Sequence, residues 1–291
     1  MSVATRSLRK EYGDTVALDG VNLTVPTGIV YGLVGPNGAG KTTLLGILAG
    51  LRRASAGEVT IEARAVGVLP DTPRFESWLT AREVVDLART LTAPEVPHDR
   101  VAEVLAIAGL EEAADRKTSG YSRGMLQRLG LAAAVVGDPD VLLLDEPAAA
   151  LDPAGRREVL DLVTTLKGRA TVVFSSHILD DVQEVCDEIG VLRRGEMVYQ
   201  GSLDGLIAGR EGLSYLVQLR SGHSQVARAL RAELWVERVL EVDGGNLEIA
   251  VSDQTLAEER MMMVLASGGH PVASFRPKTS SLEQVFLEVT R

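Results

Sequence analysis

One glycine-rich segment limits the possible folds of this 291-residue chain more than any other feature. It follows the apolar run IVYGLVG, which predicts a strand, and precedes KTTLLGILAGL, which predicts a helix. Its residues are Gly35, Pro36, Asn37, Gly38, Ala39, Gly40, Lys41, Thr42 and Thr43. Glycines let backbone N–H groups converge on phosphate oxygens, and the helix directs its positive end at the same point. An ordinary turn with an incidental lysine is the alternative, but the strand–loop–helix context favours a nucleotide phosphate loop. Lys41 would then neutralise the β- and γ-phosphates, and the Thr42 hydroxyl would ligate Mg²⁺.

A second apolar strand, VLLLDE at residues 141–146, ends in two carboxylates. In an α/β sheet this ending lies at the carboxyl edge, beside the phosphate loop. Asp145 would hold Mg²⁺ through water, and Glu146 would orient and deprotonate an attacking water. A strand that ends in an acidic turn is common, so this motif gains its weight from the phosphate loop.

The spacing of apolar residues divides the chain into two domains. Strands alternate with crossover helices over residues 1–211, which predicts an α/β core with a parallel sheet and a helical block at about 72–136. Composition changes at 205–212, and residues 212–291 predict a small ferredoxin-like α+β domain of order β-α-β-β-α-β. Its elements are strand 214–220, helix 224–233, a hairpin about Gly244-Gly245, helix 254–265, strand 271–275 and a closing helix 281–289.

Composition excludes several functions. The net charge of −10 opposes binding to nucleic acid or anionic lipid, and 4% aromatic residues are too few for a base-stacking platform. The single Cys186 cannot form an internal disulfide, so a reducing cytosol fits. No apolar stretch reaches the roughly 18 residues that span a bilayer.

Further motifs are more specific. The run Tyr121-Ser122-Arg123-Gly124-Met125 lies just ahead of the VLLLDE strand and resembles the signature of ATP-binding cassette (ABC) transporter subunits. Ala150-Leu151-Asp152 resembles that family's D-loop, and His177 resembles the switch histidine that contacts the γ-phosphate. Tyr12, with Val16 as its apolar neighbour, lies where the family stacks an aromatic ring on adenine. A plain strand tyrosine is the alternative. The ending SSLEQVFLEVT is similar to the tail of drug-export-type subunits.

The resemblance implies a P-loop NTPase cassette with an antiparallel β subdomain, a parallel-sheet core and a helical subdomain. In this family, two cassettes pair head to tail and close on ATP and Mg²⁺, so Ser122 and Gly124 would act in trans on the partner's nucleotide. The chain would then need a second cassette, identical or paralogous, and a separate membrane permease at the cytoplasmic face of the cell membrane. The apolar residues Phe75, Trp78 and Leu79 would either receive a permease helix or pack the helical block.

One position departs from the family pattern. The loop after the strand AVGVLP usually carries Gln, and this chain has Asp71. Asp71 could ligate Mg²⁺, or crowd Asp145 and Glu146, so its role as a sensor is in doubt. Two rival functions are a non-transport cassette ATPase of DNA repair or translation and a regulatory module without turnover. The single cassette argues against the first, and the presence of both Glu146 and His177 argues against the second.

Overall fold

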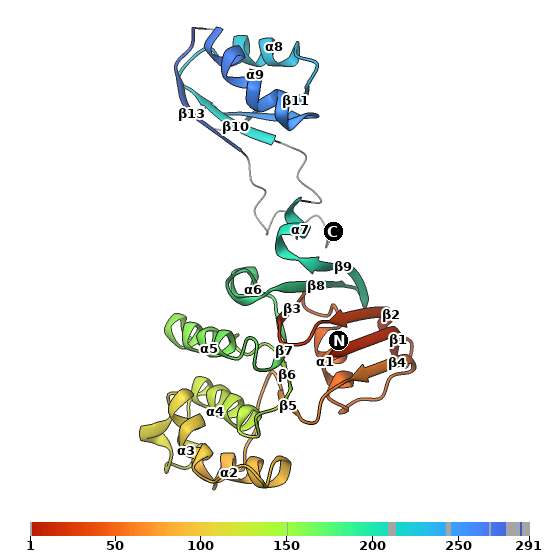
Figure 1. Ribbon diagram of the computed structural model, residues 1–291, viewed down its shortest axis with the longest axis vertical. Coiled ribbons are helices and arrows are strands. Elements are labelled where there is room, and N and C mark those ends of the chain that lie inside the picture. The colour runs from red at the N-terminus through yellow and green to blue at the C-terminus, as the bar shows by residue number, and fades with distance from the viewer. Residues whose placement is uncertain are drawn as a thin grey trace. The chain divides into compact units, whose positions relative to one another are not determined.

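The computed structural model describes residues 2–149, 151–208, 214–242, 246–267, 269–277 and 286. The chain forms two compact units, divided between Leu203 and Asp204 (Figure 1). The expected domain boundary between residues 211 and 212 lies outside the described residues. Among the described helices, none has the length and apolar character that a membrane span requires.

The first unit contains strands and helices in alternation after an initial pair of strands. Its strands are β1 Val3–Tyr12, β2 Thr15–Val25, β3 Val30–Val34, β4 Ala56–Ile61, β5 Val66–Leu69, β6 Val141–Leu144, β7 Thr171–Ser176, β8 Glu188–Arg193 and β9 Glu196–Ser202. Its helices are α1 Lys41–Leu48, α2 Ala81–Thr92, α3 Arg100–Ile107, α4 Arg123–Val135, α5 Pro153–Thr165 and α6 Leu179–Val185. Helix α7, Leu203–Ala208, follows.

A six-stranded sheet of order β5-β6-β7-β3-β8-β9 forms the core of this unit. All neighbouring pairs are parallel except β8 and β9, which form an antiparallel hairpin. Every residue of β3, β6 and β7 is buried, as expected for central strands of a parallel sheet. The predicted α/β core is confirmed, and β3 delivers the phosphate loop to the carboxyl edge from the middle of the sheet.

A three-stranded antiparallel sheet of order β2-β1-β4 lies on the other side of α1 (Figure 1). Helix α1 joins the two sheets because its apolar residues Leu44, Leu45 and Leu48 share one core cluster with Leu23 of β2 and Leu33 of β3. The antiparallel β subdomain is thereby confirmed, and the helix that begins at the phosphate loop is packed on both sides.

The helical block consists of α2, α3 and α4, and its first helix begins at Ala81. Residues 72–80 form no helix, because Pro73 interrupts the pattern and Thr80 caps α2. The Thr80 hydroxyl accepts a bond from the N–H of Glu83, whose carboxylate accepts one from the Thr80 N–H in return. Glycines let α4 approach β5 closely, since a Cβ on Gly67 would lie 2.3 Å from the Ala134 oxygen.

Helices α5 and α6 are joined by one buried and one exposed ion pair. Arg156 Nε lies 2.5 Å from Asp181 Oδ1, and the Asp181 side chain is only 4% exposed. Arg157 and Glu184 pair at 3.8 Å on the same two helices, with both side chains about half exposed or more. Burial raises the pKa of Asp181, while its bond to Arg156 lowers it. Because Asp181 loses most of its hydration, removing Arg156 alone would leave a buried carboxylate unpaired, whereas loss of the exposed pair costs little.

The turn between β8 and β9 is hydrogen-bonded to the backbone of the phosphate loop. It is formed by Arg194 and Gly195, both with positive φ, as its position in the sequence predicts. The Gly195 N–H donates to the Ala39 oxygen at 3.0 Å, and the Gly195 oxygen accepts from the Asp19 N–H at 2.8 Å. The turn therefore ties the loop to β2.

The second unit contains β10 Ser214–Leu219, α8 His223–Arg231, β11 Val236–Val242, β12 Asn246–Val251, α9 Gln254–Ser267 and β13 Val272–Pro277. Its sheet has the order β11-β12-β10-β13, with all neighbours antiparallel. This order and the alternation with two helices confirm the ferredoxin-like arrangement. Trp235, 3% exposed, belongs to its core. The hairpin turn at Gly244-Gly245 and the closing helix 281–289 lie outside the described residues.

Candidate active site

One cavity of about 330 Å³ gathers most of the residues that the sequence singles out. Its lining residues are Ala17, Asn37, Gly38, Ala39, Gly40, Lys41, Thr42, Thr43, Asp71, Glu146, Ala149 and His177. They come from the phosphate loop, the start of β2 and the loops after β5, β6 and β7. The carboxyl ends of three neighbouring parallel strands therefore meet the phosphate loop at one edge of the sheet.

The phosphate loop needs glycine at two tightly packed positions. Gly40 caps α1 with a φ of 109°, and a Cβ there would lie 2.7 Å from the Ala17 oxygen. Gly35 has no strained φ, but its Cβ would lie 2.4 Å from the Leu192 oxygen. Lys41, 6% exposed, donates from Nζ to the Gly35 oxygen at 2.7 Å. The loop thus holds the ammonium group of Lys41 at the N-terminus of α1, as a phosphate-binding loop requires.

The two carboxylates after β6 have different surroundings. Asp145 is 5% exposed, and its N–H donates to the Leu69 oxygen of β5 at 2.8 Å. Glu146 points into the cavity, with Oε1 3.5 Å from Lys41 Nζ and Oε2 2.8 Å from His177 Nδ1. Its backbone has a φ of 49°, a left-handed conformation that non-glycine residues seldom adopt. Lys41, Glu146 and His177 therefore form one connected cluster.

Ser175 belongs to the site but is absent from the sequence-based prediction. Its hydroxyl donates to Asp145 Oδ1 at 2.6 Å and accepts from the Glu146 N–H at 2.9 Å. Its side chain is fully buried at the end of β7, two residues before His177. The available signal was a pair of serines closing an otherwise apolar strand.

The oxygen ligands around the cavity fit a magnesium ion that shares its coordination with a nucleotide. Thr42 and Asp71 line the cavity, while Asp145 is buried next to the lining residue Glu146, and hydroxyl and carboxylate oxygens are ligands that Mg²⁺ prefers. Among the described residues, no three or more His, Cys, Asp or Glu side chains are grouped to hold a metal by themselves. This donor set matches Mg²⁺ bound through one or two carboxylates plus substrate phosphates.

Tyr12 and Val16 lie outside the cavity, across the β1–β2 hairpin from each other. They are 44% and 39% exposed, and Glu11 pairs directly with Val16. The Tyr12 hydroxyl accepts a bond from Arg52 Nη1 at 2.9 Å, and Lys10 Nζ lies 4.7 Å from the ring centroid. The ring is therefore held at its edge and covered by a cation on one face.

Ser122 and Gly124 also lie outside the cavity, at the start of α4. Ser122 caps this 13-residue helix, since its hydroxyl accepts from the Met125 N–H at 3.2 Å. A Cβ on Gly124 would lie 3.0 Å from Leu151 Cδ2, so the start of α4 contacts the loop that leads into α5. The side chain of Asp152 caps α5 in the same way, by accepting from the Gly155 N–H.

A family model described as "ABC transporter" matches residues 18–149. The chain is 35% identical to an uncharacterized ABC transporter ATP-binding protein, YxlF, of Bacillus subtilis, over 99% of both chains. It is 34% identical to the daunorubicin/doxorubicin resistance ATP-binding protein DrrA of Streptomyces peucetius, over 99% of this chain and 92% of that protein. A Nod factor export ATP-binding protein of Burkholderia orbicola is 33% identical over 100% and 98%.

Solved structures agree with this assignment. The ATP-binding subunit of an ABC transporter superposes with a TM-score of 0.66 and 26% identity, covering 72% of this chain and 93% of that one. A dimeric ATP-binding cassette in a post-hydrolysis state with ADP and Pi gives a TM-score of 0.62 and 27% identity, covering 69% and 98%. The phosphate loop, the Glu146 cluster and these likenesses together lead to one conclusion. The chain belongs to the ABC transporter family, as an ATP-binding subunit.

Proposed function

We propose that this chain hydrolyses ATP, as one of a pair of cassettes, to drive export through a separate membrane permease. The observation that carries the proposal is the cavity in which Glu146 contacts both Lys41 and His177 beside the phosphate loop. A nucleotide-binding module without turnover has no need for a carboxylate held between a cation and an imidazole at that point.

Hydrolysis assigns a role to each residue of this cluster. Glu146 accepts a proton from water as the water oxygen attacks the γ-phosphorus, and the bond from that phosphorus to the ADP oxygen breaks. Lys41 neutralises the β- and γ-phosphates, and the backbone N–H groups of Gly38 to Thr43 bind phosphate oxygens. His177 orients Glu146 through the 2.8 Å contact and approaches the γ-phosphate. Tyr12 and Val16 provide the adenine platform.

Three residues would hold the metal. When bound, Mg²⁺ offsets phosphate charge that develops during transfer. The Thr42 hydroxyl would be a direct ligand, and Asp145 would act through water. Asp71 adds a further carboxylate to the cavity wall, where the family usually has a neutral amide. We assign it to the metal because it lines the same cavity as Thr42 and Glu146.

A second cassette completes the site. Ser122 and Gly124 form a capped helix start that lies outside the cavity of their own chain, with the positive end of α4 available for a phosphate. In a head-to-tail pair they would bind the partner's γ-phosphate. The solved cassette in the post-hydrolysis state is a dimer, which supports this arrangement.

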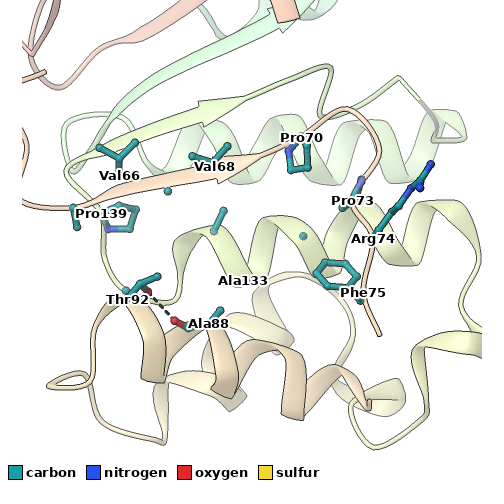
Figure 2. Close-up of a pocket in the computed structure, with 15 residues that line it drawn as sticks. Val66, Val68, Pro70, Pro73, Arg74, Phe75, Ala88, Thr92, Ala133 and Pro139 are labelled. Carbon is teal, nitrogen blue, oxygen red and sulfur yellow. Dashed lines mark hydrogen bonds between the residues drawn. The ribbon is translucent and has the colours of Figure 1, made fainter. Parts of the chain in front are cut away.

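The permease would dock in an apolar groove of about 420 Å³ between β5, α4 and α2 (Figure 2). Val66 and Val68 of the edge strand β5 form one wall, Ala133 of α4 lies between, and Ala88 of α2 lies opposite. Pro73, Arg74 and Phe75 close one end, immediately after Asp71. Trp78 does not line this groove and is 64% exposed. An apolar helix of the permease would fit such a groove and would hold the chain at the cytoplasmic face of the membrane.

Export is supported by two relatives, one named for drug resistance and one for Nod factor export. The decisive experiment is Glu146→Gln in the full chain, which should abolish ATP turnover, retain ATP binding and accumulate an ATP-dependent dimer. Turnover that persists in this variant contradicts the assignment of the base. Co-purification of the tagged chain with a multi-span membrane protein would support transport, whereas a soluble complex with ribosomes or DNA would refute it.

A further inference from the structure

We infer that Ser175 is a positioning residue for ATP hydrolysis, which fixes the metal-ligating Asp145 and the base Glu146 in one arrangement. The inference rests on the function proposed above and adds a residue that lies outside the sequence motifs. It is carried by a single hydroxyl that bonds to both members of the carboxylate pair.

The two hydrogen bonds of Ser175 act on different parts of the site. Its hydroxyl donates to Asp145 Oδ1 at 2.6 Å, which limits rotation of that carboxylate and gives its other oxygen a defined direction. The same oxygen accepts from the Glu146 N–H at 2.9 Å, which fixes the backbone at the base. Strand register brings these groups together, since Leu144 pairs with Phe174 and the next residues on both strands therefore meet.

The backbone of Glu146 needs such a restraint. Its φ of 49° is a left-handed conformation that is unfavourable for a non-glycine residue. Ser175 holds the N–H of this residue, while Lys41 and His177 hold its carboxylate. Without Ser175 the main chain can relax towards an ordinary conformation, and the carboxylate is then displaced from the water that it must deprotonate.

The positioning role of Ser175 can be tested separately from a purely structural role, because β7 carries a second buried hydroxyl that lies away from the site. Thr171 at the other end of the strand is also fully buried, and its hydroxyl accepts from the Gly28 N–H at 2.9 Å. Thr171 does not line the cavity. Thr171→Val therefore removes a comparable hydrogen bond from the same strand without touching the site, and it is the matched control for Ser175→Ala.

The experiment compares Ser175→Ala, Ser175→Thr and Thr171→Val in the full chain. Ser175→Ala should lower kcat roughly 10- to 100-fold, the range found when partners of metal ligands are removed, and should raise the Mg²⁺ concentration for half-maximal turnover. Titration with a fluorescent ATP analogue should show wild-type affinity without metal and a smaller gain in affinity when Mg²⁺ is added. Thr171→Val should lose thermal stability to a similar extent and keep the wild-type Mg²⁺ response. Ser175→Thr, which retains the hydroxyl, should restore most of the response.

Two outcomes would overturn the inference. One is a Ser175→Ala chain that matches Thr171→Val in both kcat and Mg²⁺ response. The other is an Mg²⁺ gain in ATP affinity that Ser175→Ala leaves intact, and this readout needs no turnover. Should Ser175→Thr fail to fold, Ser175→Cys with its weaker hydrogen bonds should give an intermediate response. Failure of the proposed function is distinct, because it shows as a wild-type chain that does not hydrolyse ATP or that co-purifies with no membrane protein.

Discussion

The buried ion pair between α5 and α6 gives the sharpest quantitative prediction. Arg156→Ala removes the partner of Asp181, whose side chain is 4% exposed, and leaves a buried carboxylate without its counter-charge. Breaking a buried pair in this way costs about 3 to 5 kcal/mol. Arg156 is 29% exposed, so water reaches part of the site and the lower end of that range applies. We expect a loss of about 3 kcal/mol at pH 7.

The same variant has a predicted pH dependence. Burial holds the folded pKa of Asp181 above its ordinary value of 3.8. At pH values between these two pKa values, the folded state therefore binds more protons than the unfolded state. Arg156 lowers this pKa, and its loss raises the pKa further. The stability that Arg156→Ala loses relative to wild type should therefore grow as pH rises from the folded pKa of Asp181 in wild type towards its higher folded pKa in the variant. It should shrink towards pH 4, where protonation removes the unpaired charge.

The neighbouring Arg157→Ala is the matched control, because it removes an arginine from the same helix with an exposed partner on α6. It should change stability by less than about 0.5 kcal/mol. Urea unfolding followed by circular dichroism records both units, and the transition of the first unit is the one that should move. At about 2 kcal/mol/M, a loss of 3 kcal/mol lowers the midpoint by about 1.5 M. In a Trp78→Phe background, Trp235 fluorescence reports the second unit alone, and its midpoint should not move. Equal midpoints for the two variants, or a deficit independent of pH, would refute the reasoning.

Other predictions concern the site. Gly40→Ala should abolish ATP binding because its Cβ would lie 2.7 Å from the Ala17 oxygen. A Cβ on Gly38 would meet no atom within 4 Å, so Gly38→Ala should bind ATP more weakly but measurably. An equal loss of ATP affinity in both variants would show that the contact with the Ala17 oxygen is not the cause. Tyr12→Ala should weaken ATP binding roughly 10-fold, as loss of base stacking does, and unchanged affinity would remove it from the adenine site. Asp71→Gln should alter stimulation of turnover by the permease, and unchanged stimulation would show that the position is not a sensor.

Local patterns were sufficient for the parts of the site that lie within one motif. The phosphate loop could be found because a strand, a glycine run and a helix follow each other without interruption, and VLLLDE because a central strand is apolar throughout. The ferredoxin-like order was also readable, since each strand and helix of the second unit has its own period. In each case the relevant physics acts between residues near in sequence.

Contacts between distant segments could not be predicted. Ser175 meets Asp145 only because β6 and β7 are neighbours in a certain register. The left-handed backbone of Glu146 is held by contacts with Ser175 and His177 at the end of β7 and with Lys41 of α1, and nothing in its own sequence neighbourhood predicts it. The approximate bounds of the helical block did not fix where its first helix starts; the cap at Thr80 sets the start of α2 at Ala81.

The turn at Gly195 has a consequence for the order in which the protein is made. A ribosome synthesises the phosphate loop early, yet the loop is braced by Gly195, and β3 lies between β7 and β8, which emerge much later. A nascent chain that ends before β7 therefore carries the apolar strand β3 without either neighbour, a form that chaperones protect. ATP binds only a finished loop, so the nucleotide stabilises the completed unit and cannot act as a template for its early folding.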